Sequence, residues 1–343
     1  MKRLMFVTNS LSGGGAERAM NLVVNELALR GFPVSLVPIN RGENDLVVPT
    51  CQVFPINRHW RGGFTDTVLS FFRFQSVVRR WKPDVLILNC DIPELFGSIA
   101  LIKTKLVVVE HANPAWSTRL SFGKLVRFIL YVRRSRWVSV SEHLRVWPTE
   151  RNFQTVLVNP LVPPIVKNEP LIPVTHDDSI LRLVFVGRLA KAQKRPDWVV
   201  RIASQLGLPA ILIGVGQMQN ELIALAKGLN AQVEFPGFQR DPWEFVKSGD
   251  LLIVPSAWEG DGLVVLEAIA RDVPLLLSDI PEFKRFKLPQ SNYCKQPEDF
   301  VSKIETINTL SCFRISATQT KFLLETRSIE RVGDDWARFI DSI

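Results

Sequence analysis

Hydrophobic positions along the chain fall in short continuous runs, each followed by a turn and then by an amphipathic stretch. The first run is Leu4–Thr8, and a glycine-rich turn separates it from a helix-like stretch over Ala16–Gly31. In the second half of the chain, Leu181–Val186 is followed by a short turn and a helix-like stretch near Pro196–Gly207. Continuous apolar runs suit parallel strands that are covered on both faces. Both halves therefore predict an α/β unit that opens with strand, turn and helix.

More buried strands are predicted from similar runs at Val34–Pro38, Val85–Leu88, Leu106–Val109, Trp137–Val140, Ala210–Ile213, Val233–Phe235, Leu251–Val254 and Pro274–Leu277. A proline-rich and then polar segment, residues 159–179, separates the two halves and has the composition of a linker. A chain of 343 residues also exceeds the usual size of one domain. We therefore expect an N-terminal domain at 1–165, a C-terminal domain at 166–328, and an amphipathic helix at 329–343 that crosses back to the N-terminal domain.

Composition narrows the class of protein. Hydrophobic residues make up 46% of the chain and charged residues 22%, as in a folded globular protein. No apolar run approaches the ~18–20 residues of a membrane-spanning helix. Cys51, Cys90, Cys294 and Cys312 are far apart and lack metal-binding spacing. They are interpreted as reduced core residues of a cytoplasmic protein, and no metal site is expected.

The positive charge is confined to the N-terminal half. Residues 1–165 hold 21 Lys and Arg against 11 Asp and Glu, a balance of +10, whereas residues 166–343 hold 21 against 23, a balance of −2. The densest basic stretch runs from Arg119 to Arg136 without an acid. Such a field attracts an anionic surface or substrate. A helix carrying Lys124, Arg127, Arg133 and Arg134 among apolar residues would lie in the interface of an anionic membrane. An ordinary surface helix packed on the sheet fits the pattern equally well.

The strongest chemical signal is the segment Pro255–Ala268, which follows a predicted strand. Glu259 and Glu267 stand eight positions apart and flank Gly260-Asp261-Gly262, where a helix begins near Leu263. The N–H groups of a helix N-terminus suit a diphosphate. A glycosidase-type carboxylate pair is a poor alternative, because eight residues on one helix span ~12 Å and such pairs need ~5–9.5 Å. Two solvated glutamates at the ends of a helix remain the structural alternative.

With these residues the chain resembles the retaining glycosyltransferases of the GT-B fold whose signature is Glu-x7-Glu, family GT4. The resemblance extends over nearly the whole chain through Gly13-Gly14-Gly15-Ala16-Glu17, Glu110-His111, Val138–Glu142, Val158-Asn159-Pro160, Phe185–Leu189, Gln193-Lys194 and Phe235–Phe238. It implies an α/β fold of two Rossmann-like domains that face each other across a cleft.

The resemblance also implies roles for individual residues. Arg188 and Lys194 would bind the donor diphosphate, Glu267 the ribose hydroxyls and Glu259 the transferred sugar. The catalytic residues are thus expected to be Glu259, His111, Arg188 and Lys194, with His111 near the sugar. The residues expected to bind the donor are Gly14, Gly15, Arg188, Lys194, Gly237, Gly262, Leu263, Val264 and Glu267. Gly14 and Gly15 would allow close approach of the ligands, and the segment around Gly237 would border the base.

Two positions depart from the family pattern. Asp261 places a carboxylate where a diphosphate is expected, which is unfavourable unless it points away or binds a sugar hydroxyl. Arg195 follows Lys194 where the family commonly has glycine, and it would add either a phosphate contact or only a surface charge. No Asp-x-Asp motif occurs in the chain. We therefore expect a metal-independent reaction, and the family favours retention by same-face attack.

The expected activity is transfer of a sugar from a UDP-hexose or UDP-N-acetylhexosamine to an acceptor hydroxyl, in lipopolysaccharide or other cell-surface glycan assembly. The nucleotide sugar is a substrate, and no cofactor is expected. The expected partners are a saccharide or lipid-linked acceptor and an anionic membrane surface, without nucleic acid. The expected location is the cytoplasm, with peripheral attachment to the inner face of the membrane as the further hypothesis. Two rival functions are a nucleotide-binding Rossmann oxidoreductase, which would bind NAD(P), and an inert glycosyltransferase-like scaffold.

Overall fold

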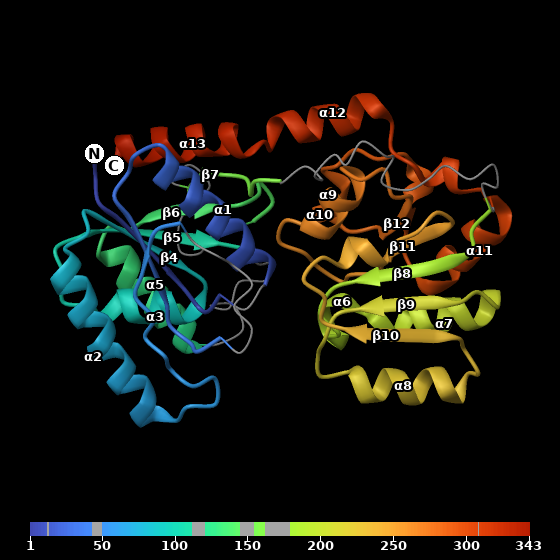
Figure 1. The fold of residues 1–343 in the computed structure, drawn as a ribbon, viewed down its shortest axis with the longest axis horizontal. Helices are drawn as coiled ribbons and strands as arrows, with labels where there is room; N and C mark the ends of the chain where they lie inside the picture. Colours follow the sequence, from blue (N-terminus) through green and yellow to red (C-terminus); the bar gives the residue numbers. More distant parts are fainter. Residues whose placement is uncertain (12–13, 43–49, 112–120, 145–153, 162–178, 308) are drawn as a thin grey trace. The chain divides into compact units, whose positions relative to one another are not determined.

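The computed structural model describes residues 1–11, 14–42, 50–111, 121–144, 154–161, 179–307 and 309–343 (Figure 1). The chain forms two compact units: unit 1 comprises Met1–Leu161 and Thr326–Ile343, and unit 2 comprises Val162–Glu325. The sequence places these divisions after residues 165 and 328. Unit 1 is thus assembled from two separate stretches of the chain, and unit 2 is the continuous stretch between them.

Unit 1 is built on a seven-stranded parallel sheet with the strand order β3-β2-β1-β4-β5-β6-β7. Strands numbered in this order on both sides of β1 are typical of the doubly wound Rossmann arrangement. Its elements are β1 Leu4–Thr8, α1 Gly15–Leu29, β2 Val34–Pro38, β3 Gln52–Val53, α2 Phe64–Trp81, β4 Val85–Asn89, α3 Asp91–Ile99, β5 Lys105–Glu110, α5 Ser121–Val132, β6 Arg136–Ser139, β7 Gln154–Val156 and α13 Ile329–Ser342.

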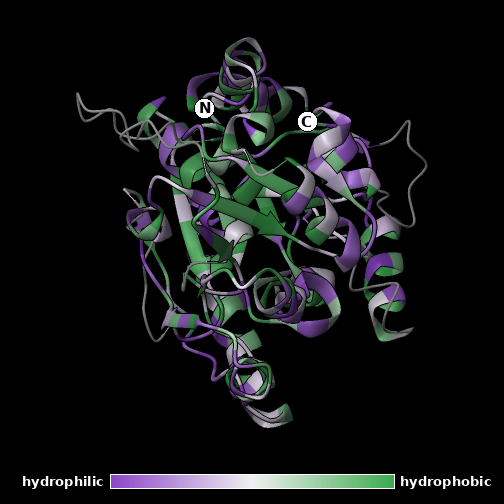
Figure 2. Cartoon of the chain, turned by 90° about the vertical axis from the view of Figure 1, so that its right-hand side faces the viewer, coloured by the Kyte–Doolittle hydropathy of each residue, from purple (hydrophilic) through white to green (hydrophobic). Residues whose placement is uncertain are grey.

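Both faces of this sheet are covered, which explains the continuous apolar runs. Leu4 and Phe6 of β1 belong to a core shared with α1 and α13. Met5 and Val7 point to the other face, into a core shared with α2, α3 and α5. Successive side chains of a strand point to opposite faces, so a strand between two helical layers must be apolar throughout. In Figure 2 the strands that can be made out, in either unit, are mostly hydrophobic, whereas the helices carry both hydrophobic and hydrophilic residues.

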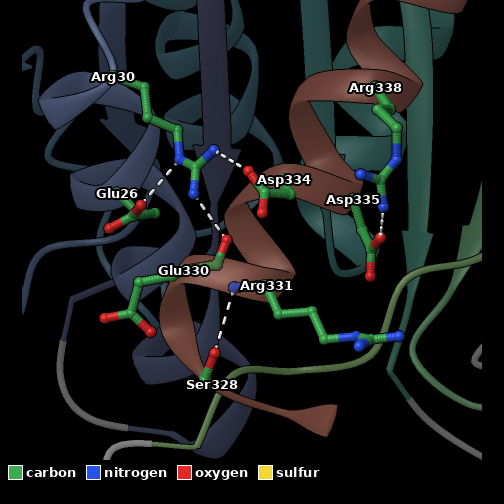
Figure 3. Close-up of polar contacts among 8 residues, drawn as sticks. All are labelled: Glu26, Arg30, Ser328, Glu330, Arg331, Asp334, Asp335 and Arg338. Carbon is green, nitrogen blue, oxygen red and sulfur yellow. Dashed lines mark hydrogen bonds and ion pairs between the residues drawn. The ribbon is translucent and has the colours of Figure 1, made fainter. Parts of the chain in front are cut away.

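The C-terminal helix α13 packs on α1 and completes unit 1 (Figure 3). Ser328 caps the helix by accepting a hydrogen bond from the Arg331 N–H at 3.2 Å. Arg30, the C-cap of α1, pairs with Asp334 and donates to the Glu330 carbonyl at 2.6 Å. At the opposite end, Lys2 Nζ donates to the carbonyls of Ile340 and Ile343 at 2.7 Å each. The N-terminal strand and the last helix are therefore joined by both polar and apolar contacts.

Unit 2 is a six-stranded parallel sheet with the order β10-β9-β8-β11-β12-β13. Numbered from its own first strand, this is the order 3-2-1-4-5-6, which is also the order of the first six strands of unit 1. Its elements are β8 Arg182–Val186, α6 Lys191–Lys194, α7 Pro196–Leu206, β9 Ala210–Ile213, α8 Gln219–Gly228, β10 Val233–Gly237, η2 Pro242–Phe245, β11 Asp250–Val254, α9 Leu263–Ile269, β12 Leu275–Ser278, α10 Pro281–Lys284, η3 Gln290–Asn292, β13 Tyr293–Cys294, α11 Pro297–Ile307, η4 Leu310–Phe313 and α12 Ala317–Thr326.

Each strand predicted from an apolar run is present, with ends shifted by a residue or two. The expectation that all four cysteines are core residues was wrong in part: Cys294 is buried, Cys51 and Cys90 are half-buried, and Cys312 is exposed. Burial raises the pKa of the Cys51 thiol to about 11 and that of the Cys294 thiol to about 12. All four thiols are free.

The basic helix predicted to lie in a membrane interface is α5, but two of its four expected surface charges face inward. Arg127 is fully buried and pairs with Glu94 at 2.6 Å and Glu110 at 2.7 Å. Arg133 turns its guanidinium to the end of α3, where it donates to the carbonyls of Gly97 at 2.7 Å and Ala100 at 2.9 Å. Of the set, only Lys124 and Arg134 are exposed.

Candidate functional site

The residues predicted to bind a donor gather at one edge of the sheet of unit 2. Gly187-Arg188 follows β8, Gly214-Val215-Gly216 follows β9, Gly237 ends β10, and Pro255–Gly262 follows β11. These strands are neighbours and run parallel, so their carboxyl ends lie along the same edge. In open parallel sheets this is the edge where ligands bind.

The loops at this edge are locked together through their backbones. Gly187 N–H donates to the Ile213 carbonyl at 3.0 Å, and Gly214 N–H donates to the Gly237 carbonyl at 2.9 Å. Gly214 has φ +142°, and a Cβ atom there would lie 2.0 Å from the Gly187 carbonyl oxygen. Only glycine fits so close an approach between two backbones. Gly214 and Gly216 were missed from sequence, although a Gly-x-Gly pair directly after a buried strand was the available signal.

Lys194 and Glu259 form a largely buried ion pair within this cluster. Lys194 Nζ lies 2.5 Å from Glu259 Oε1, which also accepts a hydrogen bond from Ser256 Oγ at 2.7 Å. Their side chains are 18% and 7% exposed. The Gln193 carbonyl accepts from Ala257 N–H at 2.7 Å, which ties α6 to the glutamate loop. The structure thus brings together a cation and a carboxylate that stand 65 positions apart in the chain.

The loop that joins the two glutamates is shaped by Gly262 and Asp261. Gly262 is the N-cap of α9 at φ +60°, a conformation that favours glycine. Asp261, which departs from the family pattern, is buried and pairs with Arg285, which also donates to its carbonyl. Its charge is therefore compensated inside the protein. The N–H groups of Leu263 and Val264 belong to the first turn of α9, where no intrahelical acceptor exists.

Glu267 on α9 is held by a tryptophan that the sequence did not suggest. Trp243 Nε1 on η2 donates to Glu267 Oε2 at 3.0 Å. The Arg271 guanidinium carbon lies 5.1 Å from the centre of the Trp243 ring, and Arg271 Nη1 donates to the Glu267 carbonyl at 3.1 Å. These contacts connect η2, α9 and the turn after α9 around one carboxylate.

The two remaining basic residues of this edge differ in their surroundings. Arg188 is exposed, and the described part of the chain offers its guanidinium no hydrogen-bond or ion-pair partner. Arg195 instead stacks on Trp198, with its guanidinium carbon 4.6 Å from the ring centre. Arg188 thus remains available to an anionic ligand, while the Arg195 guanidinium lies over an aromatic ring.

Gly14, Gly15 and His111 lie in unit 1, at the carboxyl ends of β1 and β5. Gly14 is the N-cap of α1, and a Cβ atom added at this position would lie 2.1 Å from Glu17 Oε2. His111 is half-buried and directly follows Glu110, the partner of the buried Arg127. Burial alone would lower the pKa of the Arg127 guanidinium, but the carboxylates of Glu110 and Glu94 outweigh it and raise that pKa.

Metal-binding clusters and membrane-spanning helices were sought among the described residues. In this part of the chain, no group of three or more His, Cys, Asp or Glu side chains is placed to hold a metal ion. Within the same residues, no helix has the length and apolarity needed to span a membrane.

Comparisons with known proteins find similarity to glycosyltransferases. Residues 181–309 match the family model of glycosyl transferases group 1. An uncharacterized glycosyltransferase of Haemophilus influenzae is 23% identical and covers 98% of this chain and 99% of its own. A Campylobacter jejuni N-acetylgalactosaminyltransferase named for a diphospho-undecaprenol-linked acceptor is 24% identical over 81% of each chain.

Among solved structures, Anabaena Alr3699/HepE in complex with UDP and glucose superimposes with a TM-score of 0.78 over the full length of both chains, at 15% identity. This likeness concerns the fold, and it agrees with two doubly wound units in one chain. The chain therefore has the GT-B fold, and its residues 181–309 match the glycosyl transferases group 1.

Proposed function

We propose that the protein transfers a hexose or N-acetylhexosamine from a UDP-linked donor to an acceptor hydroxyl, with retention of the anomeric configuration. The observation that carries this proposal is the Lys194–Glu259 pair at the carboxyl edge of the sheet. It places a cation that can bind phosphate beside a carboxylate that can accept hydrogen bonds from sugar hydroxyls. That is the composition needed where a sugar joins a diphosphate.

Each residue of the cluster has a role in this proposal. Lys194 and the exposed Arg188 bind the diphosphate and stabilise the negative charge that grows as the glycosidic bond breaks. Glu259 accepts from hydroxyls of the transferred sugar, and Glu267 from the ribose. The backbone N–H groups of Gly262, Leu263 and Val264 bind phosphate or sugar oxygens, and the loop at Gly237 borders the base. Gly14, Gly15 and His111 serve the sugar and acceptor from unit 1.

The proposed chemistry is a same-face displacement without a metal. The bond from the anomeric carbon to the diphosphate oxygen breaks, and a bond from that carbon to the acceptor oxygen forms on the same face. The hydroxyl proton of the acceptor passes to the leaving phosphate. The protein contributes positioning and the two cations, which oppose the charge of the leaving group.

Thermal shift with nucleoside diphosphates and their sugar conjugates tests the donor site, and NMR of the product tests the stereochemistry. UDP and a UDP-sugar should raise Tm, and the new linkage should keep the anomeric configuration of the donor. NAD(P) binding without nucleoside diphosphate binding would support the oxidoreductase alternative instead. Donor binding without turnover of donor or acceptor would identify an inert scaffold.

We further propose that the acceptor is lipid-linked and is met at an anionic bilayer, which fits assembly of lipopolysaccharide or another cell-surface glycan. The name of the Campylobacter relative, with its diphospho-undecaprenol, supports such an acceptor. In unit 1 the surface formed by α5 and the end of α3 is unusually apolar. Its exposed residues are Ile99, Leu101, Phe122, Leu125, Phe128, Tyr131 and Val132, each at least 46% exposed.

The charges around this α3–α5 surface favour an anionic lipid. Between residues 92 and 135, the acids in the described part of the chain are Glu94 and Glu110, and both are buried against Arg127. Lys103, Lys124 and Arg134 are exposed in the same stretch. Apolar side chains framed by cations are the composition of an interfacial membrane contact, with about 1 kcal/mol from each cation near the surface.

Vesicle sedimentation tests this contact with phosphatidylglycerol-containing and pure phosphatidylcholine vesicles at low and high salt. The wild type should sediment with the acidic vesicles. Replacing Phe122, Leu125 and Phe128 with Ser should abolish sedimentation, whereas Phe322→Ser, an exposed phenylalanine of unit 2, should not. A wild-type protein that ignores acidic vesicles at low salt, or dimerises through this surface, would contradict the proposal.

A further inference from the structure

We propose that Trp243 is a positioning residue that holds the Glu267 carboxylate in the orientation that binds the ribose hydroxyls. The site would thereby bind ribonucleotides in preference to deoxyribonucleotides. The inference rests on the proposed function, because it takes Glu267 as the ribose-binding carboxylate. Its basis is the hydrogen bond from Trp243 Nε1 to Glu267 Oε2 at 3.0 Å.

The direction of this hydrogen bond is fixed by chemistry. An indole N–H is a donor only, so it holds Oε2 of the carboxylate as an acceptor. In the described part of the chain, Glu267 Oε1 has no hydrogen-bond partner. A carboxylate has about four acceptor positions. Glu267 thus keeps a vacant oxygen and unused lone pairs for the two hydroxyls of a ribose, in an orientation that Trp243 sets.

Trp243 is itself fixed from two sides. Asp241 is the N-cap of η2, and its Oδ1 accepts a hydrogen bond from the backbone N–H of Trp243 at 3.0 Å. Arg271 lies over its ring, 5.1 Å from the centre, and comes from the turn that follows α9. A residue at this position therefore has its side-chain direction set before any nucleotide arrives. Preorganisation of this kind strengthens binding, because the ligand does not have to order the acceptor.

A purely structural role for the Trp243–Glu267 bond predicts something different. If the bond only joins η2 to α9, its loss lowers stability and weakens all nucleotides equally. If it positions Glu267, its loss weakens binding of the ribose hydroxyls specifically. The ratio of affinities for a ribonucleotide and its deoxy analogue separates the two roles, because a general loss of stability leaves that ratio unchanged.

The experiment is calorimetric titration with UDP, 2′-deoxy-UDP and 3′-deoxy-UDP. The wild type should prefer UDP to at least one deoxy analogue by about tenfold or more, as expected for a hydrogen bond to a charged group. Trp243→Phe keeps an aromatic ring beside Arg271, and it removes the N–H together with part of the indole ring. This variant should bind UDP about 5- to 10-fold more weakly than the wild type does. Its affinity for UDP should exceed its affinity for the deoxy analogue by no more than about threefold. In a protein that already carries Glu267→Ala, adding Trp243→Phe should leave the ratio of the affinities for UDP and the deoxy analogue unchanged.

Trp198→Phe is the matched control, because Trp198 also carries an arginine on its ring and lies on α7, away from Glu267. This control should keep the wild-type preference. A Trp243→Phe protein that binds UDP with the wild-type preference would overturn the positioning role and leave the proposed function intact. A folded wild type that binds neither UDP nor the guanine and adenine diphosphates would overturn the proposed function itself, and this inference with it.

Discussion

Lys194 Nζ lies 2.5 Å from Glu259 Oε1, and this pair joins the short helix α6 to the loop after β11. Lys191, one turn earlier on α6, is exposed and pairs instead with Glu221 on α8 at 2.8 Å. One short helix therefore carries two ion-paired lysines, of which one belongs to the candidate site and the other to the surface.

Replacing Lys194 with Ala should lower kcat/KM by at least ~10²-fold, because it removes a cation that opposes leaving-group charge. Arg188→Ala should have a similar effect. Lys191→Ala is the matched control and should keep near-normal activity, since exposed ion pairs contribute little. Initial rates over a range of donor concentrations measure these effects. Normal turnover in both Lys194→Ala and Arg188→Ala would exclude the assigned donor site.

Activity should survive treatment with excess EDTA followed by desalting. In the proposed mechanism, Arg188 and Lys194 supply the positive charge that a divalent ion supplies in metal-dependent transferases. Turnover before and after chelation, with Mn²⁺ or Mg²⁺ added back, measures the effect. Loss of activity on chelation that Mn²⁺ or Mg²⁺ restores would refute this mechanism.

Arg127→Met should destabilise unit 1 by about 3–5 kcal/mol, because it leaves two buried carboxylates without their cation. The side chains of Arg127, Glu94 and Glu110 are 1%, 1% and 5% exposed. Adding Glu94→Gln and Glu110→Gln to the variant should recover part of the loss. Urea unfolding gives the free energies, and the exposed Arg134→Met should change stability by less than ~0.5 kcal/mol. A small effect of Arg127→Met would mean that the triad is not desolvated.

Trp336→Ala should cost about 3–5 kcal/mol of stability, as for other large core aromatics. Trp336 is 2% exposed, and its ring centre lies 6.0 Å from that of Phe6 and 6.1 Å from that of Phe339. Trp60, which is 52% exposed in the same unit, provides the control. Thermal unfolding of the two alanine variants compares them. Equal Tm values would show that α13 contributes little to the core of unit 1.

The buried parallel strands could be predicted because their signal is local: Leu4–Thr8 or Leu251–Val254 is apolar at nearly every position. The strands β3, β7 and β13 were missed because they contain two or three residues each, and β3 and β7 are only partly buried. A pattern so short has no readable period.

The site was predictable to the extent that its residues are neighbours in the chain. Glu259 and Glu267 form a local pattern, whereas Trp243 reaches Glu267 across 24 positions through the fold. Arg127 was misplaced for the same reason. A count of charges assigns it to the surface, and only the packing of α3 and β5 against α5 reveals Glu94 and Glu110 beside it.

The division of unit 1 into two stretches sets the order in which the protein can fold during its synthesis. A ribosome releases Met1–Leu161 first, but the core around Leu4 and Phe6 needs Val332, Trp336 and Ile340 of α13. Unit 2 is continuous in the chain and can close its own core before α13 emerges. Although α1 already covers part of that core, the nascent N-terminal sheet keeps the rest of one apolar face uncovered until unit 2 and then α13 have been made.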